Sequence, residues 1–85
     1  MEVIYNQKAL ADLAFWKKSG DKRIQQKISI LIEDIKNNPY TGLGKPEPLK
    51  HQLSGKWSRR IDLTHRIVYT IENNVLKIYS LKGHY

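Results

Sequence analysis

The amino-acid sequence predicts an α+β domain: a small, mainly antiparallel β-sheet with an N-terminal αα-hairpin on one face, in the order β-α-α-β-β-β. Three observations lead to this fold class. Apolar residues recur with helical spacing in the first half of the chain and with strand spacing in the second half. The chain has only 85 residues, which leaves no room for a second hydrophobic core. We therefore expect one domain over residues 1–85.

A short strand and a helix open the chain. Residues 3–5 (VIY) are β-prone, and Asn6 after them is a good N-cap for a helix over residues 7–18. Gly20 suits the position just after a helix, where a left-handed backbone is common. The apolar residues that we expect this helix to turn toward the core are Ala9, Leu10, Leu13 and Trp16.

The second helix has the clearest periodicity in the sequence. Its apolar residues fall on one face of a 3.6-residue period, and they are Ile24, Ile28, Leu31, Ile32 and Ile35. Asp21 or Ser19 can cap its first turn. Pro39 ends it, because the residue before a proline avoids the helical region.

Residues 40–50 are expected to form a loop laid over the domain, because the chain that follows is too short to bury a core alone. Within this loop Glu47 stands between Pro46 and Pro48, whose rings fix the backbone φ angle at about −65°. A stiff backbone suits a catalytic base, which must be held in its productive position. The alternative is a surface spacer whose glutamate is merely solvated.

Three β-rich runs complete the sheet, over residues 57–63, 65–71 and 75–81. Asn73 and Asn74 lie between the last two runs. They predict a tight hairpin, because asparagine tolerates the left-handed conformation that such turns require.

Strand alternation in the middle run separates Arg66 from its apolar neighbours. Arg66 shares a face with Val68, whereas Ile67 and Tyr69 share the opposite face. An arginine on the open face can clamp a phosphate with its forked donors. It can also be a solvated or ion-paired structural residue, and the strand pattern leaves both interpretations open.

Composition limits the partners and the environment. Fifteen Lys and Arg against eight Asp and Glu give a formal charge of +7, which favours a polyanion such as nucleic acid or an acidic protein. The sequence has no cysteine, which excludes disulfides and thiolate zinc sites. Charges throughout the first twenty residues fit neither a signal peptide nor a membrane span. A cytoplasmic protein without a membrane partner is expected.

The chain ends in a histidine and a tyrosine. The imidazole of His84, with an ordinary pKa of about 6.5, suits proton donation near neutrality, and a frayed tail is the alternative. A metal site is not expected, because His51, His65 and His84 lack helical ligand spacing and an acidic cluster.

One carboxylate, several cations and one imidazole match the needs of RNA cleavage by internal transesterification. That reaction must remove a proton from a 2′-hydroxyl, stabilise a pentacoordinate phosphate and protonate the departing 5′-oxygen. A base and an acid each contribute about 10² to 10⁴ in rate, and one electrostatic donor about 10² to 10³. The candidate groups can therefore supply this chemistry without a metal or another cofactor.

Four motifs in order carry a family resemblance across nearly the whole chain. They are GKPEPLK (44–50), LSGKWSRRI (53–61), HRIVY (65–69) and the terminal HY (84–85). With them the chain resembles the YoeB/Txe-type toxins of bacterial type II toxin–antitoxin systems, within the RelE-like superfamily. The resemblance implies the RelE-like microbial ribonuclease fold, in the same order of elements as above.

The resemblance also implies an activity and a set of site residues. The activity is that of an mRNA interferase, a metal-independent endoribonuclease that inhibits translation by cleaving mRNA in the ribosomal A site. Glu47 matches the general base, Arg66 the phosphate-stabilising arginine and His84 the general acid. The residues implied to bind substrate are Lys50, Arg59, Arg60 and Tyr85.

The implied partners are the ribosome, mRNA and an acidic YefM/Axe-like antitoxin whose flexible C-terminal segment wraps the toxin. Operator DNA is implied only for the toxin–antitoxin complex, and a homodimer is compatible with the small core. The alternative function is a non-catalytic basic module that binds nucleic acid, or a co-repressor bound to an antitoxin. An inactive relative and a ribosome-independent ribonuclease also stay open.

Overall fold

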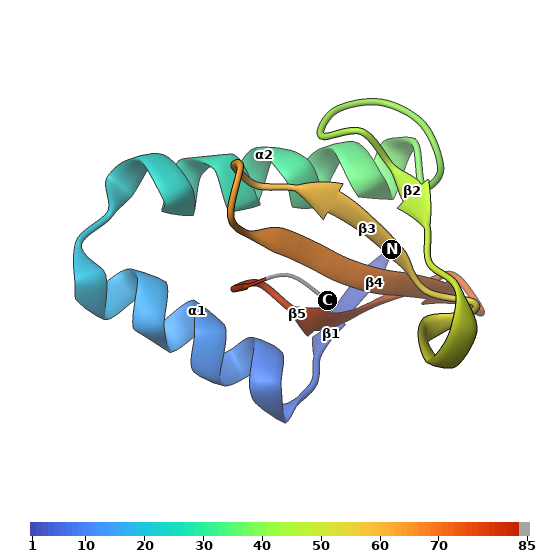
Figure 1. Cartoon of the computed structure of the whole chain (residues 1–85), viewed down its shortest axis with the longest axis horizontal. Helices are drawn as coiled ribbons and strands as arrows, with labels where there is room; N and C mark the ends of the chain where they lie inside the picture. Colours follow the sequence, from blue (N-terminus) through green and yellow to red (C-terminus); the bar gives the residue numbers. More distant parts are fainter. Residues whose placement is uncertain (84–85) are drawn as a thin grey trace.

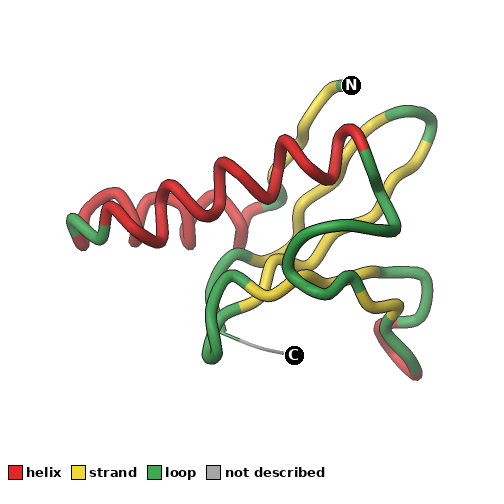
Figure 2. The backbone as a smooth tube through the Cα atoms, turned by 90° about the horizontal axis from the view of Figure 1, so that it is seen from above, coloured by secondary structure: helices red, strands yellow, loops and turns green. Residues whose placement is uncertain are grey.

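Two helices and five strands make up the part of the chain that the computed structural model describes, residues 1–83 (Figure 1). The elements are β1 (Glu2–Tyr5), α1 (Gln7–Ser19), α2 (Lys22–Asn37), β2 (Glu47–Pro48), the 3₁₀ turn η1 (His51–Leu53), β3 (Trp57–Arg60), β4 (Arg66–Glu72) and β5 (Val75–Ser80). Between α2 and β2 the chain forms a wide loop (Figure 2).

The strands form one sheet in the order β1-β5-β4-β3-β2. β1 pairs with β5 in parallel, and every other neighbouring pair is antiparallel, so the predicted fold class is confirmed. The prediction had four strands and missed β2, which pairs with β3 at the edge of the sheet. A two-residue strand has no alternation to detect, and its proline is tolerated because an edge strand pairs on one side only.

The helix caps lie where the sequence predicts them. The Asn6 side chain accepts a hydrogen bond from the Ala9 amide at 2.8 Å, and Asp21 accepts one from the Ile24 amide at 3.1 Å. Gly20 closes α1 with a φ of 73°. The two helices join through this short turn and then diverge (Figure 1). Neither of these helices is long and apolar enough to cross a membrane.

The core lies between both helices and one face of the sheet. Its buried residues come from α1, α2, the chain after β3, β4, β5 and the chain after β5: Ala9, Trp16, Ile24, Ile28, Leu31, Ile35, Ile61, Ile67, Tyr69, Leu76, Ile78 and Leu81. The prediction for Leu10 is wrong, since that residue is 54% exposed. The buried face of α1 runs through positions 9, 12 and 16, and Leu10 lies a quarter turn away from it.

The β3–β4 connection is longer than predicted. β3 ends at Arg60, and Leu63 is 93% exposed instead of continuing the strand. The Asp62 carboxylate accepts hydrogen bonds from the amides of Thr64 and His65, which closes a turn. The β4–β5 hairpin is as predicted, with both asparagines in the left-handed region.

Candidate functional site

A small pocket opens where β2, β3 and β4 meet. It has a volume of about 200 Å³. Among residues 1–83 its lining consists of Lys45, Pro46, Glu47, Pro48, Ser58, Arg60 and Arg66. Three of the sequence-predicted site residues, Glu47, Arg60 and Arg66, therefore line one pocket.

Strand register explains why these side chains share one face. Glu47 lies opposite Ser58, and Arg60 lies opposite Arg66. Residues that face each other across paired strands point to the same side, as do residues two apart on one strand. The core residue Ile67 points to the other side. The pocket is thus on the sheet face turned away from the helices.

The chain before Glu47 is fixed to β3. Gly44 accepts a hydrogen bond from the Arg60 amide at 2.7 Å. Its φ is +79°, and a Cβ at this position would lie 3.0 Å from the Arg60 carbonyl oxygen. Only glycine combines this conformation with such a close approach. Beyond it, Pro46 and Pro48 restrict the backbone on both sides of the carboxylate.

The electrostatics of the pocket suit a phosphate next to a general base. Lys45, Arg60 and Arg66 contribute three cations, and Glu47 contributes the one carboxylate among the described lining residues. Guanidinium groups bind phosphate oxygens with paired N–H donors. A carboxylate held beside such cations can accept a proton from a hydroxyl of the same ligand.

Arg59 does not line this pocket, and the prediction that it binds substrate is wrong. Its side chain is completely buried on the core side of β3. The guanidinium donates to the Asp34 carboxylate and to the backbone oxygens of Asn38, Thr41 and Leu43. Arg59 thus holds the loop that follows α2.

Two titratable side chains near Arg59, those of Asp34 and Tyr69, have shifted pKa values. The Leu43 amide and the Arg59 guanidinium hold the pKa of Asp34 below its ordinary value. Burial raises the pKa of Tyr69, whose hydroxyl donates to the Pro39 carbonyl at 2.6 Å. Both residues therefore belong to the loop support and not to the pocket.

The remaining predicted site residues lie elsewhere or outside the described chain. Lys50 is exposed and follows β2, outside the set of lining side chains. His84 and Tyr85 lie outside the described residues. The residue before them, Gly83, accepts a hydrogen bond from the Arg66 amide at 2.9 Å. The described chain therefore ends beside the backbone of Arg66.

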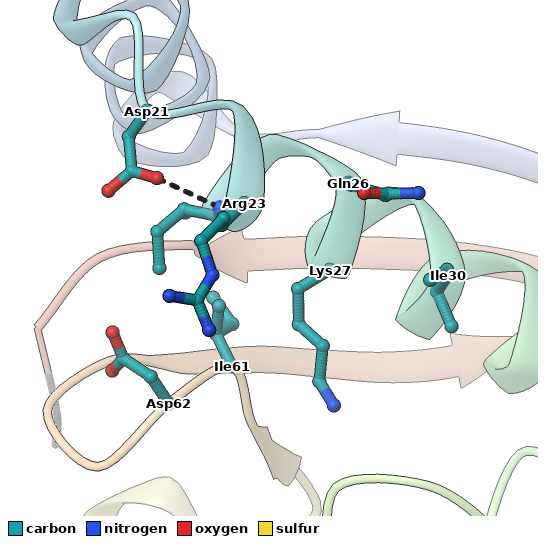
Figure 3. A pocket seen from close by; sticks show the side chains of 8 residues that line it. Asp21, Arg23, Gln26, Lys27, Ile30, Ile61 and Asp62 are labelled. Atoms are coloured by element: carbon teal, nitrogen blue, oxygen red, sulfur yellow. Dashed lines mark hydrogen bonds between the residues drawn. The ribbon is translucent and has the colours of Figure 1, made fainter.

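A larger hollow of about 580 Å³ lies at the start of α2 and is not the candidate site (Figure 3). Arg23 extends from α2 toward the loop that carries Asp62, and Lys27 lies one turn further along (Figure 3). Asp21 and Asp62 balance these two cations. None of the sequence-predicted site residues that the structure describes lines this hollow. Within residues 1–83, no three His, Asp or Glu side chains form a group that could hold a metal ion.

Besides the two prolines, the lining includes two polar residues that were not predicted as site residues, Lys45 and Ser58. Lys45 directly precedes the Pro-Glu-Pro motif, so its closeness to Glu47 in the sequence was the available signal. Ser58 lies opposite Glu47 only because β2 pairs with β3. Without that strand, nothing in the sequence connects the two.

Comparisons with known proteins give the family of the chain and solved structures of the same fold. A family model described as YoeB-like toxin of bacterial type II toxin-antitoxin system matches residues 5–85. The chain is 46% identical to toxin YoeB of Escherichia coli strain K12 over the whole of both chains. A YoeB/ParE toxin from Agrobacterium tumefaciens superposes with a TM-score of 0.95 at 39% identity, and all of both chains is covered. The toxin in a heterotetrameric YoeB–YefM complex from Staphylococcus aureus gives 0.91 at 40% identity, covering 100% of this chain and 98% of the other.

Proposed function

This chain belongs to the family of YoeB-like toxins of bacterial type II toxin–antitoxin systems, and we propose that it is an endoribonuclease that cleaves mRNA in the ribosomal A site. One observation carries the proposal: Glu47 and Arg66 line the same pocket on the sheet face that the helices leave free. A base and a phosphate-binding guanidinium on one wall supply two of the three functions that this cleavage of a phosphodiester requires.

The proposed reaction is an internal transesterification. Glu47 takes the proton of a ribose 2′-hydroxyl, and the 2′-oxygen attacks the adjacent phosphorus. A bond from the 2′-oxygen to phosphorus forms while the bond to the 5′-oxygen breaks, and His84 gives its proton to that oxygen. The products are a 2′,3′-cyclic phosphate and a 5′-hydroxyl.

The cations around the carboxylate stabilise the charge that develops on phosphate. Arg66 is assigned to the phosphate oxygens, and Arg60 and Lys45 add positive charge on the same lining. Such preorganised donors act without reorganisation during the reaction. Lys50 and Tyr85 keep the substrate-binding role that the family resemblance implies, whereas Arg59 is withdrawn from it.

The assignment of His84 as the acid rests on the family resemblance carried by the terminal HY motif. Gly83, the last residue that the structure describes, is bound to the Arg66 backbone. No metal or other cofactor is part of the proposed reaction.

An acidic antitoxin of the YefM type is the proposed protein partner. The S. aureus relative forms a complex with YefM, and the formal charge of +7 on this chain favours a negatively charged segment. We expect the antitoxin to inhibit cleavage, operator DNA to bind only the complex, and the toxin to act on ribosomes in the cytoplasm. A homodimer stays a prediction.

A purified translation system tests the proposal. Defined mRNA is incubated with the chain, with Glu47→Gln or with neither, in the presence and absence of ribosomes. The proposal predicts cuts within the A-site codon that require both ribosomes and Glu47. Binding to ribosomes without cuts would instead indicate a non-catalytic module, and cuts in free RNA would indicate a ribosome-independent nuclease.

A further inference from the structure

The chain beyond β5 is held by side chains of α1. Leu81 follows the last residue of β5, and both of its backbone polar groups bind α1: its amide donates to Asp12 at 3.0 Å, and its carbonyl accepts from the Trp16 indole at 2.9 Å. Lys8 also donates to the Asp12 carboxylate, at 2.7 Å. Asp12 and Trp16 lie about one helical turn apart, so they present these groups side by side.

A second pair of hydrogen bonds holds Gly83. Its amide donates to Nδ1 of His65 at 2.8 Å, and its carbonyl accepts from the Arg66 amide at 2.9 Å. The His65 ring packs edge-on against Trp16, with centroids 4.9 Å apart and planes at 81°. The supports of Leu81 and Gly83 are therefore in contact with each other.

The burial of Asp12 indicates that these contacts matter. Asp12 lies on the core face of α1 and is only 8% exposed, although its side chain is a carboxylate. Burying a carboxylate is unfavourable unless hydrogen bonds compensate for lost water. Here the compensation comes from the amide of Leu81 and the ammonium of Lys8, and the first of these lies 69 residues away in the sequence. A hydrophobic residue would fill the position without holding the tail.

We propose that Asp12 and His65 are positioning residues that fix the chain leading into the C-terminal His84–Tyr85 dipeptide. The inference rests on the proposed function, in which His84 protonates the leaving oxygen. Alternate residues of this chain are fixed at both N–H and C=O, and one of the four bonds goes to Arg66 itself. The same contacts thus fix Gly83, the residue before the proposed acid, relative to the backbone of Arg66.

The proposal predicts a specific kinetic effect. Neither Asp12 nor His65 lines the pocket among the described residues, so their loss should leave substrate binding nearly unchanged. A misplacement of about 1 Å can reduce the rate of chemistry by on the order of 100-fold. We expect Asp12→Ala and His65→Leu to lower the single-turnover rate constant by roughly 10- to 100-fold at saturating toxin. The toxin concentration that gives the half-maximal rate should change less than about twofold.

Conservative variants and a matched control separate positioning from general stability. Asp12→Asn keeps an oxygen that can accept from the Leu81 amide, and His65→Asn keeps an acceptor near the position of Nδ1. Both should restore most of the rate. Asp21→Ala is the matched control: it also removes a carboxylate that accepts a backbone amide bond, but at the N-cap of α2. It should lower the melting temperature without lowering the rate constant.

Amide hydrogen exchange provides a readout that does not depend on activity. In the wild-type chain the amides of Leu81 and Gly83 should exchange slowly. Asp12→Ala should accelerate exchange at Leu81, and His65→Leu should accelerate it at Gly83, while the amide of Ile24 stays protected in both. This comparison also shows whether each variant is folded.

The outcomes distinguish the two proposals. If the wild-type chain cleaves mRNA and the Asp12→Ala and His65→Leu variants cleave it at the full rate, the positioning role is overturned and the proposed function stays intact. Equal losses in the alanine and asparagine variants of Asp12 also overturn it, because the acceptor is then irrelevant. A wild-type chain that leaves ribosome-bound mRNA uncut overturns the proposed function and with it the catalytic role of these contacts.

Discussion

Glu47 and Arg66 line one pocket although their strands, β2 and β4, are not neighbours. β3 lies between them and pairs with both. Ser58 and Arg60 are two residues apart on β3, so they point to the same face, and their partners Glu47 and Arg66 point to that face as well. The proposed base and the proposed phosphate ligand are therefore fixed relative to each other by backbone pairing on two ladders.

Glu47→Gln should abolish most mRNA cleavage while leaving the fold intact. The amide is nearly the same size as the carboxylate but cannot take a proton from the 2′-hydroxyl. The rate constant should fall by about 10² to 10⁴. Single-turnover cleavage of mRNA on stalled ribosomes measures the effect, and an unchanged melting temperature is the control. Wild-type rates in this variant would remove Glu47 from the role of base.

Arg66→Lys should be nearly as inactive as Arg66→Ala. Lysine retains the positive charge but loses the planar, two-pronged donor geometry that matches phosphate oxygens. We expect the rate constant of both variants to fall by roughly 10² to 10³. If lysine instead restores full activity, then charge alone suffices and Arg66 has no geometric role.

Arg59→Leu should destabilise the protein, in contrast to the same change at Arg60. The substitution leaves the Asp34 carboxylate and the carbonyls of Thr41 and Leu43 without their donor. We expect a loss of roughly 3 kcal/mol or more in the free energy of unfolding for Arg59→Leu, and within about 0.5 kcal/mol for Arg60→Leu. Urea unfolding measures both. Similar stabilities for the two variants would contradict the structural role given to Arg59.

Arg60→Ala should weaken ribosome association in a salt-dependent way. An arginine that contacts phosphate releases counterions on binding. The logarithm of the binding constant therefore falls linearly with the logarithm of the salt concentration. Loss of one contact should reduce that slope by about 1. Titrations of labelled toxin against ribosome–mRNA complexes at several salt concentrations give the slope. A slope equal to that of the wild type would mean that Arg60 does not contact phosphate.

Acid should destabilise the fold through Asp34. The pKa of this carboxyl is lowered by the Leu43 amide and the Arg59 guanidinium. Its contribution is therefore present above the unfolded-state pKa of about 3.9 and is lost as pH falls through the lower folded-state pKa. Between about pH 5 and pH 2, the free energy of unfolding should fall more steeply for the wild type than for Asp34→Asn. Parallel pH profiles would contradict this.

Local signals in the sequence were sufficient for the helices and their caps. Asn6, Gly20 and Asp21 act on backbone groups within three residues of themselves, so a short window contains the whole interaction. The alternation of Ile67 and Tyr69 likewise indicated the core face of β4. These features need no knowledge of the tertiary structure.

Features that depend on distant partners could not be predicted in the same way. Arg59 and Arg60 are identical neighbours, and only the pairing of β3 with β4 decides which one is buried. The partner of Arg59, Asp34, lies 25 residues away on α2. Asp12 resembles a solvent-exposed helical residue until its bond to Leu81 is known.

The chemical identity of the RNA ends is the most direct test of the proposed mechanism. Defined mRNA on ribosomes is treated with the wild-type chain, and the ends at the cut are analysed by ligation with and without prior phosphorylation of the 5′ end. Transesterification by Glu47, Arg66 and His84 predicts a 2′,3′-cyclic phosphate and a 5′-hydroxyl at a cut in the A-site codon. A 5′-phosphate at the cut, or intact mRNA, would contradict it.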